Sequence, residues 1–84
     1  MKQHEGIVVV AYLPGQPRSQ VEADLQMHGF DEFTTAVIHE DGGAGMAAKV
    51  NLYDEAHDLA TDVANAGFGC MICEQGIPSG WSVA

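Results

Sequence analysis

The order in which strand-like and helix-like segments follow one another constrains the fold of this chain more than any single motif does. Residues 6–13 are dense in valine and isoleucine, which predicts a buried strand, and the prolines and glycine of residues 14–17 end it. Ser19 with Glu22 three residues later forms a capping-box pattern, which predicts a helix start at Ser19. Gly29 stands where a C-terminal cap would end this helix.

The middle of the chain is open to two interpretations. Residues 33–41 are rich in threonine and β-branched residues, which predicts a second strand, and the glycine-rich residues 42–45 predict a hairpin loop. Residues 49–53 alternate polar with apolar side chains, which predicts a third strand after the hairpin. A single long helix over residues 46–66 also has acceptable apolar spacing, and periodicity alone does not decide between the two.

The segment 54–66 is the clearest helix of the sequence. Asp54 can cap its start and Gly67 can end it. The first helix has a narrower inner stripe, which contains Val21 and Leu25. In the second helix the apolar side chains recur on one face: Ala56, Leu59, Ala60, Val63 and Ala64.

A last strand over residues 68–74 and a loose tail over residues 76–84 complete a chain of 84 residues, which is enough for a single domain, 1–84. A domain this short has a thin core, because it buries only about 60% of the surface that its unfolded chain exposes. The resulting order is β-α-β-β-α-β, the ferredoxin-like pattern. The predicted fold class is therefore α+β, with two helices on one face of a four-stranded antiparallel sheet.

Charge is the outlying property of the sequence. Twelve acidic residues stand against three basic ones, which gives a formal net charge of -9, and residues 19–84 hold eleven acids and one base, Lys49. Nucleic acid and anionic lipid would both be repelled, so we expect no direct nucleic acid binding and no membrane binding. A basic protein surface is the expected partner. The alternative is that the acidity only keeps the chain in solution.

The second helix carries a row of acids. Asp54, Asp58 and Asp62 are four residues apart and line one outer stripe, with Glu55 beside them. Asp54 and Glu55 complement the helix dipole by roughly 0.3 to 1 kcal/mol each, whereas Asp62 lies near the negative end. The row is either an ordinary solvated face or a set of carboxylates that imitates a phosphate backbone and engages a groove of arginine and lysine. We favour the second interpretation and expect these four acids to bind the partner.

Further acids lie outside that helix. Glu40 and Asp41 precede the glycine loop and are also expected to bind the partner, and Asp31 and Glu32 form another acidic patch. The small residues 42–45 could present backbone N–H groups to an anion. They lack the lysine and the hydroxyl residue of a phosphate loop, and the neighbouring carboxylates would repel phosphate, so a flexible hairpin loop is the prediction.

Cys70 and Cys73 have C-x-x-C spacing, and four histidines lie elsewhere. A zinc site needs four converging ligands, and two residues three apart in a strand point to opposite faces. The pattern predicts packing in the core, with no metal and no cofactor. A small metal or redox protein that uses Cys70 and Cys73 is the alternative.

We expect no enzymatic activity, because the sequence lacks a catalytic arrangement. Ser19 and Ser79 lack the flanking turn of a nucleophile elbow. His39 and Glu40 face opposite ways as neighbours in a strand. Trp81 is expected to fold back on the sheet. The alternative is that Trp81 and Tyr12 contact a partner.

In overall profile the chain resembles the small acidic inhibitors that phages make against host defence, anti-CRISPR proteins in particular. The resemblance is one of general character over the whole chain: its short length, its single domain and its acidic row. No sequence motif is shared. It implies a non-enzymatic inhibitor that occludes a basic nucleic-acid-binding surface, such as that of a CRISPR effector subunit. Pro14 and Gly15 after the first strand are similar to ACT domains, which would imply a module that senses a small ligand.

The apolar runs of the sequence are short. The longest, residues 7–13, falls far below the roughly 20 residues that a membrane span requires. Two cysteines are also too few for a disulfide scaffold. We therefore expect a cytoplasmic protein, in the host cytoplasm if it is encoded by a phage, and the sequence gives no indication of its oligomeric state.

Overall fold

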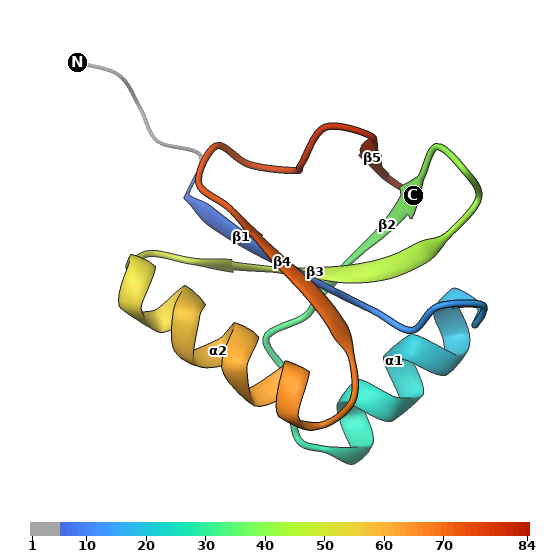
Figure 1. Ribbon diagram of the computed structural model, residues 1–84, viewed down its shortest axis with the longest axis horizontal. Coiled ribbons are helices and arrows are strands. Elements are labelled where there is room, and N and C mark those ends of the chain that lie inside the picture. The colour runs from blue at the N-terminus through green and yellow to red at the C-terminus, as the bar shows by residue number, and fades with distance from the viewer. Residues whose placement is uncertain (1–5) are drawn as a thin grey trace.

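A computed structural model describes residues 6–84 as two layers, an antiparallel sheet with both helices against one of its faces (Figure 1). The order in the sheet is β4-β1-β3-β2-β5. The predicted α+β class is confirmed, and the arrangement is compatible with a ferredoxin-like fold. The unpredicted fifth strand makes the element order βαββαββ. The elements are β1 (Ile7–Tyr12), α1 (Arg18–Met27), β2 (Thr35–His39), β3 (Ala44–Val50), α2 (Tyr53–Asn65), β4 (Gly69–Cys73) and β5 (Trp81–Val83).

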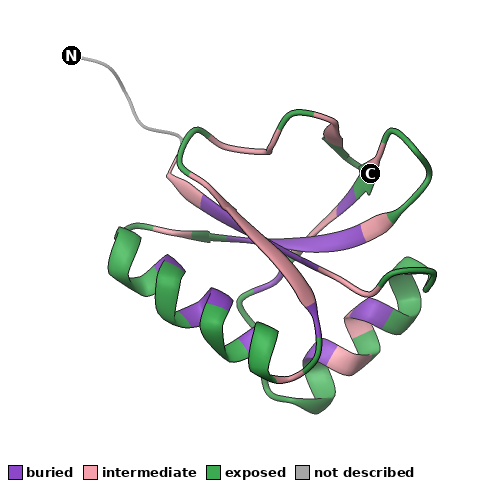
Figure 2. Ribbon diagram, viewed as in Figure 1, coloured by how far each residue is buried: buried purple, intermediate pink, exposed green. Residues whose placement is uncertain are grey.

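Both helices bury an apolar stripe against the sheet and expose the rest of their surface (Figure 2). The predicted stripe of α1 is confirmed, since Val21 and Leu25 are buried. In α2 the predicted stripe is confirmed at four positions, but Ala64 is exposed. Within residues 6–84, neither helix is long and apolar enough to cross a membrane. The buried positions of α2 are Ala56, Leu59, Ala60 and Val63.

Both helices end at the predicted glycine. Gly29 has a φ of 81° and Gly67 a φ of 102°, a left-handed conformation that glycine adopts without the steric cost of a Cβ. The residue after each glycine folds back over the last turn. In α1 the Phe30 N–H donates to the Leu25 carbonyl at 2.9 Å, and Phe68 occupies the same position after α2. Each helix end thereby places a phenylalanine against the helix-side core.

The predicted helix starts are wrong in detail. Helix α1 begins one residue before Ser19, because the extended Pro17 takes the N-cap position and its carbonyl accepts the first helical hydrogen bonds. Glu22 therefore pairs with the arginine at the helix start, at 3.0 Å, and completes no capping box. The N-cap of α2 is Leu52, so Asp54 lies inside the first turn, where it complements the helix dipole without capping by its side chain.

The central strand β3 corrects both predictions for the middle of the chain. It starts within the expected glycine loop and ends at Val50, so most of the expected strand 49–53 lies outside it. The alternative prediction, a single helix over residues 46–66, is also wrong. Ala47 and Ala48 favour helix as single residues. In the fold they are buried in a strand that pairs with β1 on one side and β2 on the other. Leu52, expected in the strand, is 60% exposed at the start of α2.

The sheet face away from the helices has a smaller core of its own. Val8, Val10, Val37 and Ala47 are buried there, and Ile77 packs on them. The segment that carries Ile77 crosses this face from the β4 edge to the β5 edge (Figure 1). The end of the expected loose tail is thus a strand, since β5 pairs with β2.

Candidate functional site

The predicted acidic row lies on the outer face of α2. Asp54, Asp58 and Asp62 are all exposed. The α1–β2 loop brings Glu32 to the same region. A groove of about 420 Å³ is the result, and we call it the acidic groove: its lining residues are Glu32, Val50, Glu55, Asp58, Leu59 and Asp62. Asp54 lies outside this lining, and Glu32 is a member that the sequence analysis assigned to a separate patch.

No lysine or arginine neutralises the acidic groove within residues 6–84. Within residues 6–84, Arg18 pairs with Glu22 on α1. His39 Nδ1 lies 2.8 Å from Asp41 Oδ1, a contact that is an ion pair only when His39 is protonated. The carboxylates of α2 therefore repel one another, by roughly 0.2 to 0.5 kcal/mol for each pair four residues apart. A cationic partner would remove this repulsion.

Exposed apolar side chains lie at the start of the same helix. Leu52 is 60% exposed and Tyr53 is 49% exposed. The Tyr53 ring lies 6.4 Å from the ring of His57, one turn further along α2. Together with the half-buried Val50 of the acidic groove, these residues give the acidic surface apolar area that a partner could bury.

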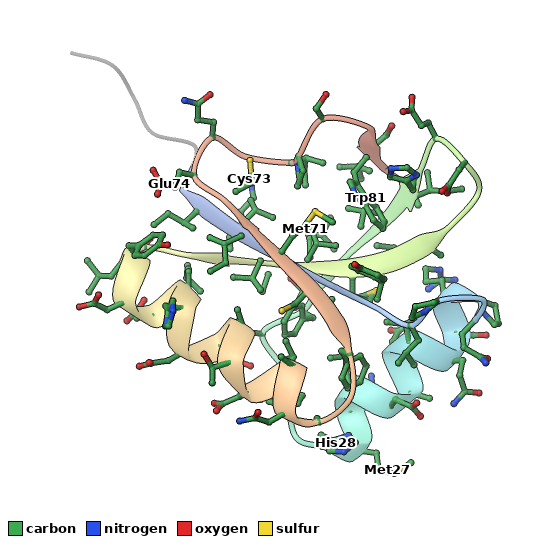
Figure 3. The ribbon with its side chains drawn as sticks, in the orientation of Figure 1. Met27, His28, Met71, Cys73, Glu74 and Trp81 are labelled. Atoms are coloured by element: carbon green, nitrogen blue, oxygen red, sulfur yellow. The ribbon has the colours of Figure 1, made fainter. Side chains whose placement is uncertain are left out.

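A second concave site, of about 830 Å³, lies on the other face of the sheet. We call it the aromatic groove and define it by Tyr12, His39, Asp41, Met71 and Trp81, with the loop residues 13–17 and 42–44 around them. Strand pairing brings two of these side chains together, because His39 of β2 lies opposite Trp81 of β5. Met71 and Trp81 point away from the helices in Figure 3. The expectation that Trp81 folds back on the sheet is confirmed.

Two glycines let the aromatic rings lie against the strands. A Cβ added at Gly69 would lie 2.5 Å from the Tyr12 ring, and one added at Gly45 would lie 3.3 Å from Trp81 Cζ3. The two rings are 5.9 Å apart between centroids, with an interplanar angle of 41°. This site was not predicted from the sequence, because Gly45 falls in the segment expected to be a flexible hairpin loop. Glycine at strand positions was the signal that could have indicated close packing.

His39 and Asp41 form a pair at one end of the aromatic groove. Asp41 Oδ1 lies 2.8 Å from His39 Nδ1 and accepts the Gly43 N–H at 2.9 Å. The Gly43 hydrogen bond, followed by the interaction with His39, holds the pKa of Asp41 below its usual value. The His39 ring meets Trp81 edge-on at 5.0 Å. The groove therefore has an ionised carboxylate beside an aromatic wall.

The structure separates the acids that the sequence grouped as partner-binding. Glu40 and Asp41 lie at the β2–β3 turn, and α2 is at the other side of the molecule (Figure 1). Asp41 lines the aromatic groove, whereas Glu40 is exposed and its backbone N–H donates to the Gly80 carbonyl at 2.8 Å. Pro14 and Gly15, the basis of the similarity to ACT domains, also line the aromatic groove.

The two cysteines lie on opposite faces of β4, as predicted. Cys70 packs on the helix side, where its Sγ donates to the Ala60 carbonyl at 3.4 Å and burial raises the pKa of the thiol. Cys73 points to the other face, toward the crossing segment (Figure 3). Among residues 6–84, no three histidine, cysteine or acidic side chains lie close enough together to hold a metal ion.

The two grooves differ in composition. The aromatic groove is lined by aromatic and apolar side chains together with the His39–Asp41 pair. The acidic groove is lined by carboxylates and two apolar residues. Comparisons of the chain with protein-family models, with curated proteins and with solved structures find no match.

Proposed function

We propose that the protein is a non-enzymatic binding protein whose α2 surface engages a basic protein partner. The observation that carries the proposal is the acidic groove, where Glu32, Glu55, Asp58 and Asp62 converge with no lysine or arginine of the described chain among them. A basic surface is the partner that gains most from this arrangement, because complementary charges steer association and suppress wrong partners.

Charge and apolar area contribute different things to the proposed contact. The formal net charge of -9 draws a basic partner from a distance and raises the association rate. The half-buried Val50 inside the groove and the exposed Leu52 and Tyr53 supply apolar surface whose burial stabilises the complex once it has formed. This combination accounts for the exposure of large apolar side chains on such an acidic helix.

The specific form of the proposal is an inhibitor of a host defence complex, of the anti-CRISPR type. Successive acids of the row Asp54, Asp58 and Asp62 are about 6 Å apart along the helix axis, since each residue rises about 1.5 Å. Such a row of regularly spaced negative charge would occupy a channel of arginine and lysine that otherwise holds nucleic acid. The site of action would be the cytoplasm of the host, on a CRISPR effector subunit.

Charge reversal on α2 tests the proposal. The variant D58K/D62K should bind a partner recovered from host lysate at least tenfold more weakly than the parent does, because two attractive contacts become repulsive. Its fold should persist, since both side chains are exposed. A lysine at position 58 would attract Asp54 one turn earlier, and the two new lysines would repel each other only as the two acids do now. Dissociation constants at low and high salt, with a thermal melt of each variant, provide the measurement.

The matched control is D24K/E74K, which makes the same change in net charge away from the acidic groove. Asp24 lies on α1 and Glu74 lies after β4. This control should retain most of the affinity and differ mainly in the association rate. If both double variants lose affinity equally, net charge and not the α2 surface determines binding, and the proposal is wrong.

A further inference from the structure

We propose that the aromatic groove is a binding site for a small organic cation that carries a guanidinium or alkylammonium group. The inference does not depend on the α2 surface. The cavity of about 830 Å³ lies within the range of roughly 300 to 1,000 Å³ typical of small-molecule sites. Its walls come from four separate segments, as expected for a site shaped by the fold: the end of β1 with the loop after it, the β2–β3 hairpin, β4 and β5.

Asp41 sets the sign of the ligand's charge. It is the one lining residue of this groove whose side chain is acidic. The lining contains no lysine or arginine, and its histidine, His39, adds a positive charge only when it is protonated. Both contacts of Asp41 in the fold, with Gly43 and with His39, use Oδ1. Oδ2 is therefore the oxygen that a guanidinium or ammonium N–H can reach. Anionic ligands would meet this carboxylate and the exposed Glu40 beside it.

The aromatic rings set the kind of cation. Tyr12 and Trp81 line the groove at 5.9 Å from each other and present π systems that attract cations, with tryptophan the strongest of the side chains. Met71 adds a polarisable apolar side chain to the lining. A hydrated metal ion gains little from such walls, whereas an organic cation places its alkyl part against them and its charged end on Asp41.

Trp81 makes the site directly measurable, because it is the single tryptophan of the chain. We would titrate n-butylguanidinium and, as its neutral isostere, n-butylurea, and follow the emission of Trp81. Butylguanidinium should give a saturable change, and butylurea should give none at the same concentrations. In ¹⁵N-labelled protein the shifts should centre on the Trp81 side-chain N–H and on the Gly43 and Ala44 amides.

D41N is the test variant and E74Q its matched control. Asparagine keeps an oxygen that can accept the Gly43 N–H, so the turn should persist, and a thermal melt checks this. D41N should weaken butylguanidinium binding roughly fivefold, the order expected for one lost charge-assisted contact at an exposed site. E74Q removes one charge outside both grooves and should leave binding unchanged.

Three results would overturn the proposal: equal binding of butylurea, no saturable change with butylguanidinium, or equal weakening by D41N and E74Q. The first would mean that apolar contact and not charge selects the ligand, and the third that net charge acts at a distance. Binding of an arginine-containing peptide without binding of butylguanidinium would make the groove a protein contact and also refute a small-molecule site. D41N changes the aromatic groove and D58K/D62K changes the acidic groove. A negative result for the small-cation site is therefore distinguishable from a negative result for the α2 interface.

Discussion

The two glycines under the aromatic rings predict two different costs for the same substitution. Neither Gly45 nor Gly69 has a positive φ, so alanine at either position is opposed by sterics alone. A Cβ at Gly45 would lie 2.8 Å from the Ala11 carbonyl oxygen, and backbone in the middle of the sheet has little room to yield. We expect G45A to lower the free energy of unfolding by about 3 kcal/mol, the upper part of the range for overpacking.

At Gly69 the obstacle is a side chain. The added Cβ would lie 2.5 Å from two carbons of the Tyr12 ring, which can swing away at the loss of its contact with Trp81. Loss of that aromatic contact costs about 0.5 to 1.5 kcal/mol of stability. Part of this cost is offset, because alanine is more favourable than glycine inside a strand. G69A should therefore cost only about 1 kcal/mol. Urea unfolding of both variants, followed by Trp81 emission and by far-ultraviolet circular dichroism, measures the two costs.

A double-mutant cycle with Y12L tests the mechanism at Gly69. If the Tyr12 ring occupies the space of the missing Cβ, G69A should cost little or nothing in the Y12L background, which gives a coupling energy of about 1 kcal/mol. An equal cost of G69A in both backgrounds would refute the placement of the ring. A cost of G45A no larger than that of G69A would refute the argument from backbone rigidity.

Two further predictions concern titratable groups. Because the pKa of Asp41 is lowered in the folded protein, its contribution to stability is present above the unfolded pKa of about 3.9 and is lost as pH falls through the folded value. The difference in melting temperature between the parent and D41N should shrink below about pH 4, and a difference independent of pH would contradict this. Burial raises the pKa of the Cys70 thiol, so a thiol reagent at pH 8 should label Cys73 first, as read by peptide mass spectrometry. Faster labelling of Cys70 would count against its position under α2.

Local signals predicted the helices well. The stripe that contains Leu59 and Val63 has the period of an α-helix, and Gly29 and Gly67 mark places where only a left-handed residue closes the last turn. These features depend on neighbours along the chain, which a sequence displays directly. The acidic row on α2 followed from the same periodicity, because residues four apart share a helix face.

Features that depend on distant partners were missed. Ala47 and Ala48 prefer helix as single residues and become strand because β3 lies between two other strands. The strand around Trp81 is only three residues long and depends on pairing with β2. The aromatic groove requires Tyr12 and Trp81 to meet across the sheet, and nothing in their spacing along the chain indicates that they do.

The most direct test of the proposed α2 interface is a map of chemical shifts. ¹⁵N-labelled protein would be titrated with its purified partner, and the amide shifts compared across residues 6–84. Perturbations should concentrate on Glu32, Glu55, Asp58 and Asp62, and should decrease as salt rises, because exposed charges are screened over about 10 Å at 0.1 M. Perturbations confined to the aromatic groove or to the β4 edge, with α2 unchanged, would contradict the claim that the acidic surface of α2 engages the partner.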